Sequence, residues 1–394
     1  MDSTSSVDRG EADWLVGNPT RQQLAASLWV GSVGLLVLGL QPVLLGALFT
    51  QGHVTGDELA LVATAELITI GIGSAIVAMA LPARNMRGKS AILLILLALA
   101  NVWTARSAGA NMLIAARAAA GLAEGGLVAV ATELIARSRK AERIGGYFVS
   151  LQTLAQCVLT LLLTLAVIPA YGASGGFMAL AVVCVLSLVV AQAVADDYAD
   201  LPRDEHFSNV LTPGAITALL SIFCYFMFFG SVWAFLEPLG AQYGIDGRTV
   251  GLIVSASLAA QISGAMTATV FEARINYRVA IIGVGVVAVL ACVVLASKPA
   301  LTAFWAAALA MGFILLFVVP YQIRLAIAAD ETRMAALLVP AAQLFGLALG
   351  PVAASLLIDE GDFRAVPEFA AVSVIASVAL LGLFVALARR RAAV

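Results

Sequence analysis

Residues 113 to 136 read LIAARAAAGLAEGGLVAVATELIA, a stretch apolar enough to lie in lipid that nevertheless contains Arg117 and Glu124. The run exceeds the about 20 apolar residues that a helix needs to cross a hydrocarbon core of about 30 Å. A charged side chain at the centre of a bilayer costs at least about 2.5 to 3.5 kcal/mol on insertion scales. Each charge therefore predicts a partner, a water-filled cavity or a function.

The composition of the whole chain is that of an integral membrane protein. Of its 394 residues, 62% are hydrophobic and 12% are charged, and the mean hydropathy is +1.01. A soluble domain has about 45 to 50% apolar and about 25% charged residues. The net charge is -2 and the few basic residues lie in short loops, so no nucleic-acid-binding surface is indicated.

The chain shows no sign of a metal site or of catalytic groups. Its four cysteines lie inside apolar runs without a close pair, and its two histidines fall in predicted loops. This pattern predicts neither a disulfide framework nor a metal centre. Since no nucleophile constellation and no phosphate-binding loop is visible, we expect neither enzymatic activity nor a cofactor.

Long apolar runs recur along the chain and predict an all-α membrane protein. Twelve of them reach the length of a spanning helix. Their ranges, numbered as helices 1 to 12 in this order, are 24–50, 57–81, 90–106, 110–136, 145–170, 174–195, 214–243, 249–272, 278–297, 300–328, 333–358 and 366–388.

A polar connection after the sixth run divides the chain into two halves. It reads DDYADLPRDEHFSNVLTPG, and the LQPVLLG of the first run is echoed by the LEPLG of the seventh. Two related six-helix bundles with a solute site between them are a recurrent transporter plan. The predicted parts are a tail (1–23), a first bundle (24–195), a linker (196–213), a second bundle (214–388) and a basic tail (389–394).

The basic residues indicate the orientation of the chain, because cytoplasmic loops carry the excess of lysine and arginine. Only Arg106, Arg248, Lys298 and Arg364 fall in loops on one side, and all other basic residues except Arg117 fall on the side of the termini. Both tails and the linker are therefore predicted to be cytoplasmic. We expect a multi-pass protein of a bacterial inner membrane.

Several motifs resemble those of the major facilitator superfamily, and the resemblance covers essentially the whole chain. The loop ALPARNMRGK resembles the basic signature loop of the family through Arg84, Arg87 and Lys89, although the leading glycine and the aspartate are absent. Helix 4 resembles the arginine-glycine motif, and GLALGP in helix 11 resembles a common packing pattern. Helix 5 lacks the GxxxGP pattern of drug-proton antiporters, which favours uptake over multidrug efflux.

The resemblance implies two pseudo-symmetric bundles that work by alternating access, with helices 1, 4, 7 and 10 lining the solute cavity. The spacing of Arg117, Gly121 and Glu124 is also similar to the helix 4 signature of spinster-type lysolipid transporters. In those proteins the arginine and the glutamate are linked to proton coupling, and only this coupling is carried over here.

Helix geometry selects the residues that would carry a proton. Arg117 and Glu124 project from nearly the same face of helix 4, about 10 Å apart along its axis. Helical side chains lean toward the amino terminus, so Arg117 leans away from Glu124 and needs another carboxylate. Glu66 lies at a matching depth. We expect Glu66, Arg117 and Glu124 to form a proton-coupling group, and the alternative is a structural bridge that locks the helices together.

Further polar and aromatic side chains are candidates for solute contacts or for gates. For the solute contacts the alternative is ordinary packing or interhelical hydrogen bonding. The candidate solute contacts are Gln41, Gln152, Gln156, Tyr225, Trp233, Glu237 and Gln322. The candidate gate or bracing residues are Arg84, Arg87, Glu133 and Arg324, of which Glu133 is expected to pair with loop arginines.

These observations predict a proton-coupled symporter that takes up a small organic or amphipathic solute, acts as a monomer and uses no cofactor besides protons. One rival is a proton-coupled exporter of drugs, metabolites or lysolipids. Another is a receptor or assembly protein that uses the fold without transport. Three candidate carboxylates and one arginine make a cavity that repels a simple polyanion.

Overall fold

The computed structural model describes residue 14 and residues 18–80, 82, 84–138, 141–198, 212–271, 274–330, 334–359 and 361–392. Regular structure in these ranges is helical, apart from one isolated bridge between Trp14 and Ser138. Most of the predicted amino-terminal tail, residues 199–211 of the predicted linker and the last two residues of the predicted basic tail lie outside them.

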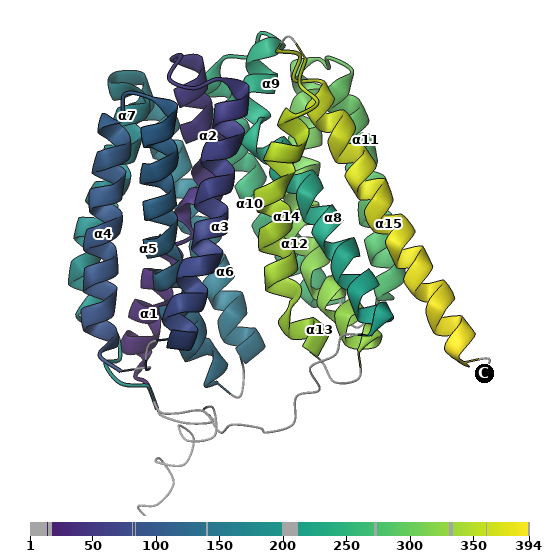
Figure 1. Cartoon of the computed structure of the whole chain (residues 1–394), viewed down its shortest axis with the longest axis horizontal. Coiled ribbons are helices and arrows are strands. Elements are labelled where there is room, and N and C mark those ends of the chain that lie inside the picture. Colours follow the sequence, from purple (N-terminus) through teal and green to yellow (C-terminus); the bar gives the residue numbers. More distant parts are fainter. Residues whose placement is uncertain are drawn as a thin grey trace, which may run out of the picture.

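The first half of the chain forms one group of helices, the first bundle (Figure 1). Its elements are α1 (Arg21–Val33), α2 (Leu36–Thr50), α3 (Gly56–Ala80), α4 (Met86–Arg106), α5 (Ala110–Ala136), α6 (Ala141–Leu162), the π-helix η2 (Leu163–Val167) and α7 (Ile168–Ala191).

The second half forms the neighbouring group, the second bundle. Its elements are α8 (Pro213–Ala234), α9 (Leu236–Gln242), α10 (Gly247–Phe271), α11 (Tyr277–Ala296), α12 (Leu301–Ala329), α13 (Met334–Leu337), α14 (Val339–Ser355) and α15 (Ala365–Ala392).

The helices are long enough to cross a bilayer, in which every backbone polar group needs a partner within its own segment. Ten stretches of the described helices are long enough and apolar enough to cross a membrane. One of them, Arg143–Ala191, leaves helical geometry at Gly172, where φ is 67°. Glycine accepts this left-handed conformation without a steric penalty, and the stretch therefore makes two crossings. With the shorter α14, the predicted twelve crossings are present.

The first and seventh crossings are each broken at a residue that precedes a proline. The chain leaves helical geometry at Leu35 between α1 and α2, and at Phe235 between α8 and α9. Pro42 and Pro238 follow a short distance later. Proline removes a helical hydrogen bond and its ring clashes with the carbonyl four residues earlier, so it bends the helix. The break at Phe235 lies three residues before Pro238, within the turn that a proline disturbs, whereas the break at Leu35 lies one turn further away, seven residues before Pro42.

The two bundles meet toward one end of the molecule. This is the end where α2, α9 and α14 terminate, at the top of Figure 1, and we call it the closed end. Contacts between the bundles join α2 to α8, α9 and α10, α3 to α14, and α6 with η2 to α10.

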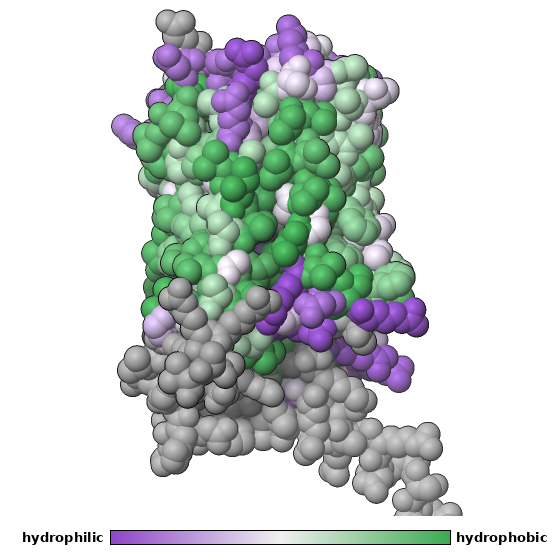
Figure 2. Space-filling view, turned by 90° about the vertical axis from the view of Figure 1, so that its right-hand side faces the viewer, coloured by the Kyte–Doolittle hydropathy of each residue, from purple (hydrophilic) through white to green (hydrophobic). Residues whose placement is uncertain are grey.

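The outer surface matches a membrane environment. Figure 2 shows a broad apolar band on one face, bordered by hydrophilic residues toward the two ends of the molecule. Many large apolar side chains are exposed in this protein, among them Val189 (76% exposed) and Leu186 (65%). A contiguous apolar surface of this extent fits a bilayer, whereas a soluble monomer rarely exposes one.

Candidate functional site

Arg117 lies in α5 at the centre of the first bundle and is completely buried. It forms ion pairs with Glu66 of α3 and with Glu124 of its own helix, the latter with an Nη2 to Oε1 distance of 3.3 Å. Glu66 and Glu124 are themselves buried, at 1% and 3% exposure. The three residues expected to form a proton-coupling group are thus in contact.

Two other helices complete the surroundings of the guanidinium. Arg117 Nη1 donates a hydrogen bond to Asn101 Oδ1 of α4 at 2.9 Å. The ring of Phe177 from α7 faces the guanidinium at 5.2 Å from its centroid, a cation-π distance. This cluster of Glu66, Asn101, Arg117, Glu124 and Phe177, which we call the Arg117 cluster, joins four helices.

The Arg117 cluster has unused hydrogen-bonding capacity. Beyond the ion pairs, both carboxylate oxygens of Glu66, Oε2 of Glu124 and Nε of Arg117 have no hydrogen-bond partner among the described residues. One guanidinium balances the charge of only one carboxylate. Because an unbalanced charge is costly in a buried site, a proton on one of the two glutamates is the simplest way to make this cluster neutral.

The glycines of α5 allow the Arg117 cluster to form. A side chain at Gly121 would collide with the backbone oxygen of Glu66, and one at Gly125 would collide with the backbone of Ile70. Glycine at these positions lets α5 approach α3 closely enough for Arg117 to reach Glu66. The motif AAGLAEGG therefore sets the distance between the two helices as well as supplying a charge.

Glu237 of α9 lies between the two bundles at the closed end. It is 5% exposed, and its carboxylate packs against Gly46 of α2 and Gly247 of α10. A Cβ at Gly46 would overlap this carboxylate, and a Cβ at Gly247 would lie 2.8 Å from Oε1. In this conformation Glu237 thus fills a space between glycines of both bundles.

Trp233 and Gln156 bind the backbone where the first crossing is bent. The indole of Trp233 donates from Nε1 to the carbonyl of Leu38 at 2.8 Å, and Gln156 Nε2 donates to the carbonyl of Leu35 at 2.6 Å. Leu38 is four residues before Pro42, which has no N–H to offer its carbonyl. Trp233 therefore supplies, from the other bundle, the hydrogen bond that the proline removes.

The remaining candidate solute contacts lie at separate places. Gln41 is buried and its Nε2 has no hydrogen-bond partner among the described side chains and backbone. The buried Tyr225 donates to the carbonyl of Ile314 at 3.3 Å. Gln322 is buried and accepts from Gln343 at 3.3 Å. Gln152 is half-buried on α6.

The candidate gate residues lie near the other end of the molecule. Arg84 is exposed, and Arg87 donates from Nε to the carbonyl of Val194 at 2.7 Å. Glu133 pairs with Arg137 at 2.5 Å, one helical turn away. Arg324 is half-buried on α12.

Asn101 and Phe177 were not anticipated from the sequence. Asn101 is a lone amide in the apolar run LLALANVWTAR, and a polar side chain in a spanning helix is a signal of an interhelical hydrogen bond. Phe177 carries no comparable signal, because an aromatic residue in a spanning helix is most often packing. Its position over Arg117 depends on how α7 packs in three dimensions.

Residues 218–394 match the family model of the Major Facilitator Superfamily. None of the curated proteins compared with the chain matches it by sequence.

Solved transporter structures share the fold. A bacterial homologue of the human lysosomal transporter Spinster, in an inward-facing and unoccupied conformation, is 12% identical with a TM-score of 0.67, and the match covers 94% of this chain and 96% of that one. The nucleoside transporter NupG is 12% identical with a TM-score of 0.68, and the match covers 93% of this chain and 99% of that one.

At such identities the structural matches establish the fold and not the solute. The chain is therefore a multi-pass membrane protein with the fold of these transporters. The resemblance to the Major Facilitator Superfamily is confirmed, by the family's own model over residues 218–394 and by the fold over almost the whole chain.

Proposed function

We propose that this protein is a proton-coupled secondary transporter that takes up a small organic or amphipathic solute across a bacterial inner membrane by alternating access. The observation that supports it best is the buried Arg117 between Glu66 and Glu124. A group of this kind is expensive to place in a bilayer, so its presence favours a function.

The charge balance of the Arg117 cluster supports proton coupling. With both glutamates ionised the cluster carries one net negative charge, and with one protonated it is neutral. Water reaching the cluster from one side of the membrane, or a movement of Arg117 from one glutamate to the other, would change which state is favoured. A proton taken up on one side and released on the other would then drive the solute.

The contacts at the closed end support alternating access. Thr64 of α3 donates to the carbonyl of Ala348 of α14 at 2.5 Å, and Cys157 of α6 to the carbonyl of Ser255 of α10 at 3.4 Å. Phe49 of α2 meets Phe363 of the second bundle edge to face at 5.3 Å. With the predicted orientation, these contacts shut the outer side and correspond to an inward-facing state.

The solute class follows from the groups near the cavity that the fold implies. Gln41, Gln152 and Gln322 are neutral hydrogen-bonding groups, and the titratable residues of the proposed site carry excess negative charge. These groups favour a neutral, zwitterionic or cationic solute. The name of one structural neighbour, a nucleoside transporter, gives one solute class with which a search begins, and the resemblance of Arg117, Gly121 and Glu124 to spinster-type lysolipid transporters gives another.

The proposal is tested by a ligand-stabilisation screen of the purified protein at several pH values, with nucleosides, lysophospholipids and small organic cations as probes. A probe that stabilises the protein is then added to proteoliposomes containing a pH-sensitive dye. We expect the entry of the probe into the proteoliposomes to be accompanied by an entry of protons, which the dye reports. Solute entry without any proton movement would contradict the coupling, and the absence of movement for every stabilising probe would contradict transport.

A further inference from the structure

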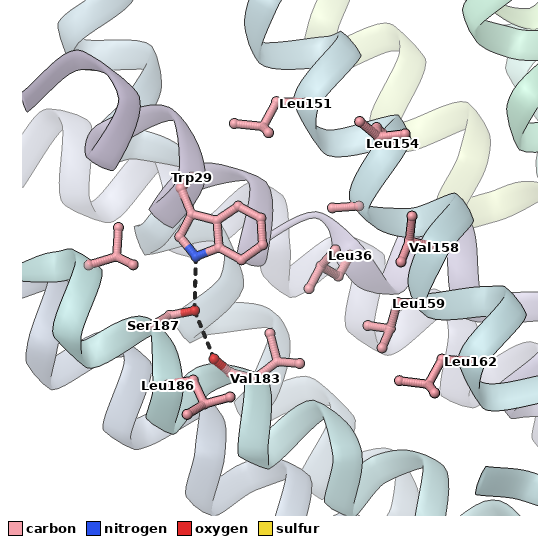
Figure 3. Close-up of a pocket in the computed structure, with 12 residues that line it drawn as sticks. Trp29, Leu36, Leu151, Leu154, Val158, Leu159, Leu162, Val183, Leu186 and Ser187 are labelled. Atoms are coloured by element: carbon pink, nitrogen blue, oxygen red, sulfur yellow. Dashed lines mark hydrogen bonds between the residues drawn. The ribbon is translucent and has the colours of Figure 1, made fainter. Parts of the chain in front are cut away.

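A groove on the outside of the first bundle is separate from the Arg117 cluster. It has a volume of about 440 Å³ and lies between α6 and α7, with the α1–α2 crossing as its floor. Figure 3 shows Leu151, Leu154, Val158 and Leu162 along one side and Ser187 on the other, with the indole of Trp29 between them.

The groove presents hydrocarbon to whatever fills it. Its two polar side chains bind each other, since Trp29 Nε1 donates to Ser187 Oγ at 3.0 Å and Ser187 Oγ donates to the carbonyl of Val183 at 2.7 Å. Neither the N–H nor the O–H of these two side chains is therefore left to donate to a polar ligand. Because burial of an unpartnered polar group is unfavourable, the occupant is an apolar chain.

The groove opens toward the lipid. Leu154, Val158 and Leu162 on α6 are 54%, 60% and 51% exposed, and Leu186 on α7 is 65% exposed. All four lie in the stretch Arg143–Ala191, which is apolar and long enough to span the membrane. The molecules that surround this face are consequently the acyl chains of the bilayer.

The length of the groove fits one leaflet. From Leu151 to Leu162 a helix rises about 16 Å, which is about half of a hydrocarbon core of about 30 Å. On α7 the lining runs from Val183 to Val190, next to the end of that helix at Ala191. The groove thus extends from the interior of the bilayer toward the end of the bundle where α6 begins.

A cation and an aromatic ring continue the same face of α6 beyond the groove. Arg143, Tyr147, Leu151, Leu154 and Val158 are spaced by four, four, three and four residues, the spacing of a single helix face. Arg143 donates from Nε to the hydroxyl of Tyr147 at 2.8 Å, and its guanidinium lies 5.6 Å from the centroid of the ring. Tyr147 is 51% exposed.

Along this face a positive charge, an amphipathic ring and a hydrocarbon groove succeed one another. A phospholipid has the same order, with a phosphate, an interfacial region and an acyl chain. Tyrosine is enriched at the membrane interface, and basic residues next to a spanning helix attract anionic lipids. We propose that the groove holds one acyl chain of an anionic phospholipid, whose phosphate binds Arg143.

Quenching of Trp29 fluorescence tests the occupant directly, because the indole lines the groove. The full chain and its Trp29→Phe variant are reconstituted in phosphatidylglycerol with brominated acyl chains, and the difference between their signals reports Trp29. We expect the Trp29 signal to be quenched to less than half of its value in unbrominated lipid. An unquenched Trp29 signal would overturn the proposal.

A variant that fills the groove provides a second test. Ala155→Phe places a ring among the lining residues and is expected to abolish most of the quenching of Trp29. Val182→Phe is the matched control, because Val182 is exposed on α7 and does not line the groove. Equal quenching in both variants would show that the lipid lies outside the groove.

The headgroup is tested by competition between phosphatidylglycerol and phosphatidylcholine for the groove. The wild type is expected to prefer phosphatidylglycerol several-fold, and Arg143→Gln is expected to lose this preference. Arg278→Gln is the control, since Arg278 also lies over a tyrosine, Tyr277, at 5.5 Å. A preference that survives in Arg143→Gln, or cross-linking that places a second copy over Leu154, would contradict the proposal.

Discussion

The indole of Trp233 in the second bundle donates a hydrogen bond to the carbonyl of Leu38 in the first bundle, at 2.8 Å. The carbonyl is free to accept it because Pro42, four residues later, has no N–H. Leu38 belongs to the first crossing, which contains the LQP motif, and Trp233 belongs to the seventh, which contains the LEP motif. The carbonyl that the proline leaves free in one crossing is thus bound by a side chain of the other, and we expect this contact to break when the closed end opens.

Removal of the Trp233 indole should therefore favour opening of the closed end. In Trp233→Phe the carbonyl of Leu38 loses its partner, and a buried hydrogen bond of this kind contributes about 0.5 to 1.5 kcal/mol, so the ratio of open to closed states should rise about 2- to 10-fold. Spin labels at Asp57→Cys and Arg248→Cys, in a background without native cysteines, measure the separation of the bundles.

The matched control for that variant is Trp305→Phe, which alters a half-buried indole on α12. It should leave the distance distribution of the labels unchanged. If Trp233→Phe also leaves the distribution unchanged, the contact with Leu38 does not help to shut this end.

A side chain at Gly46 should have a larger effect than the loss of Trp233. In Gly46→Ala the new methyl group collides with the carboxylate of Glu237 across the interface, and overpacking typically costs about 1 to 3 kcal/mol. We expect the labels to report mainly the open state and the rate of transport to fall. Gly71→Ala is the control, because a methyl group there meets no neighbour, and a closed distribution in Gly46→Ala would contradict the role of Glu237.

Asp362 near the closed end makes hydrogen bonds that should not change with pH in the physiological range. Its carboxylate accepts hydrogen bonds from Arg364 and from Gln242, and these hold its pKa well below the usual range. Because the pKa of Asp362 is lowered in the folded state, its contacts stabilise the fold fully at any pH above about 3.9, the ordinary pKa of aspartate. This stabilisation is lost only when the pH falls through the lower pKa of the folded state.

The contribution of Asp362 to the position of Phe363, whose backbone N–H donates to Gln242 and whose ring packs on Phe49, should accordingly be the same from about pH 5 to pH 8. Label distances at the closed end in the absence of solute can be recorded over this range for the wild type and for Asp362→Asn. The variant should open more readily at every pH. A change with pH that is present in the wild type and absent from Asp362→Asn would refute the assignment.

The close approach of α5 to α3 should depend on Gly121. In Gly121→Ala the methyl group meets the backbone of Glu66, so the helices separate and Arg117 loses its ion pair with Glu66. We expect a destabilisation of about 1 to 3 kcal/mol, seen as a lower apparent Tm of the purified protein. Gly145→Ala on α6, where no neighbour is in reach, should leave the Tm within error, and a similar Tm for both variants would count against close packing at Gly121.

The sequence was sufficient to predict the membrane fold and its twelve crossings. Spanning helices must satisfy their own backbone, so a run of apolar residues nearly determines its structure. Pro42 and Pro238 each mark a missing backbone hydrogen bond in the first and seventh crossings, but the sequence does not say which group takes its place. That information lies in the packing of one bundle on the other.

The Arg117 cluster was predictable in part. The expectation that Arg117 needs a carboxylate besides Glu124 rests on the direction in which helical side chains lean, and depth selected Glu66. Asn101 and Phe177 depend on the packing of α4 and α7 around α5, which a single sequence does not encode in a readable pattern. The roles of Gln41, Gln152 and Gln322 in solute binding remain predictions for the same reason.

Proton-driven accumulation by Glu124→Gln in proteoliposomes, set beside solute exchange without a proton gradient, tests the coupling role of the Arg117 cluster most directly. Glu368→Gln, an exposed glutamate on α15, serves as the control and should resemble the wild type in both assays. We predict that Glu124→Gln retains exchange and loses accumulation, because a permanently neutral side chain cannot take up or release a proton. Accumulation equal to that of the wild type would contradict the proposal that Glu124 is part of the proton pathway.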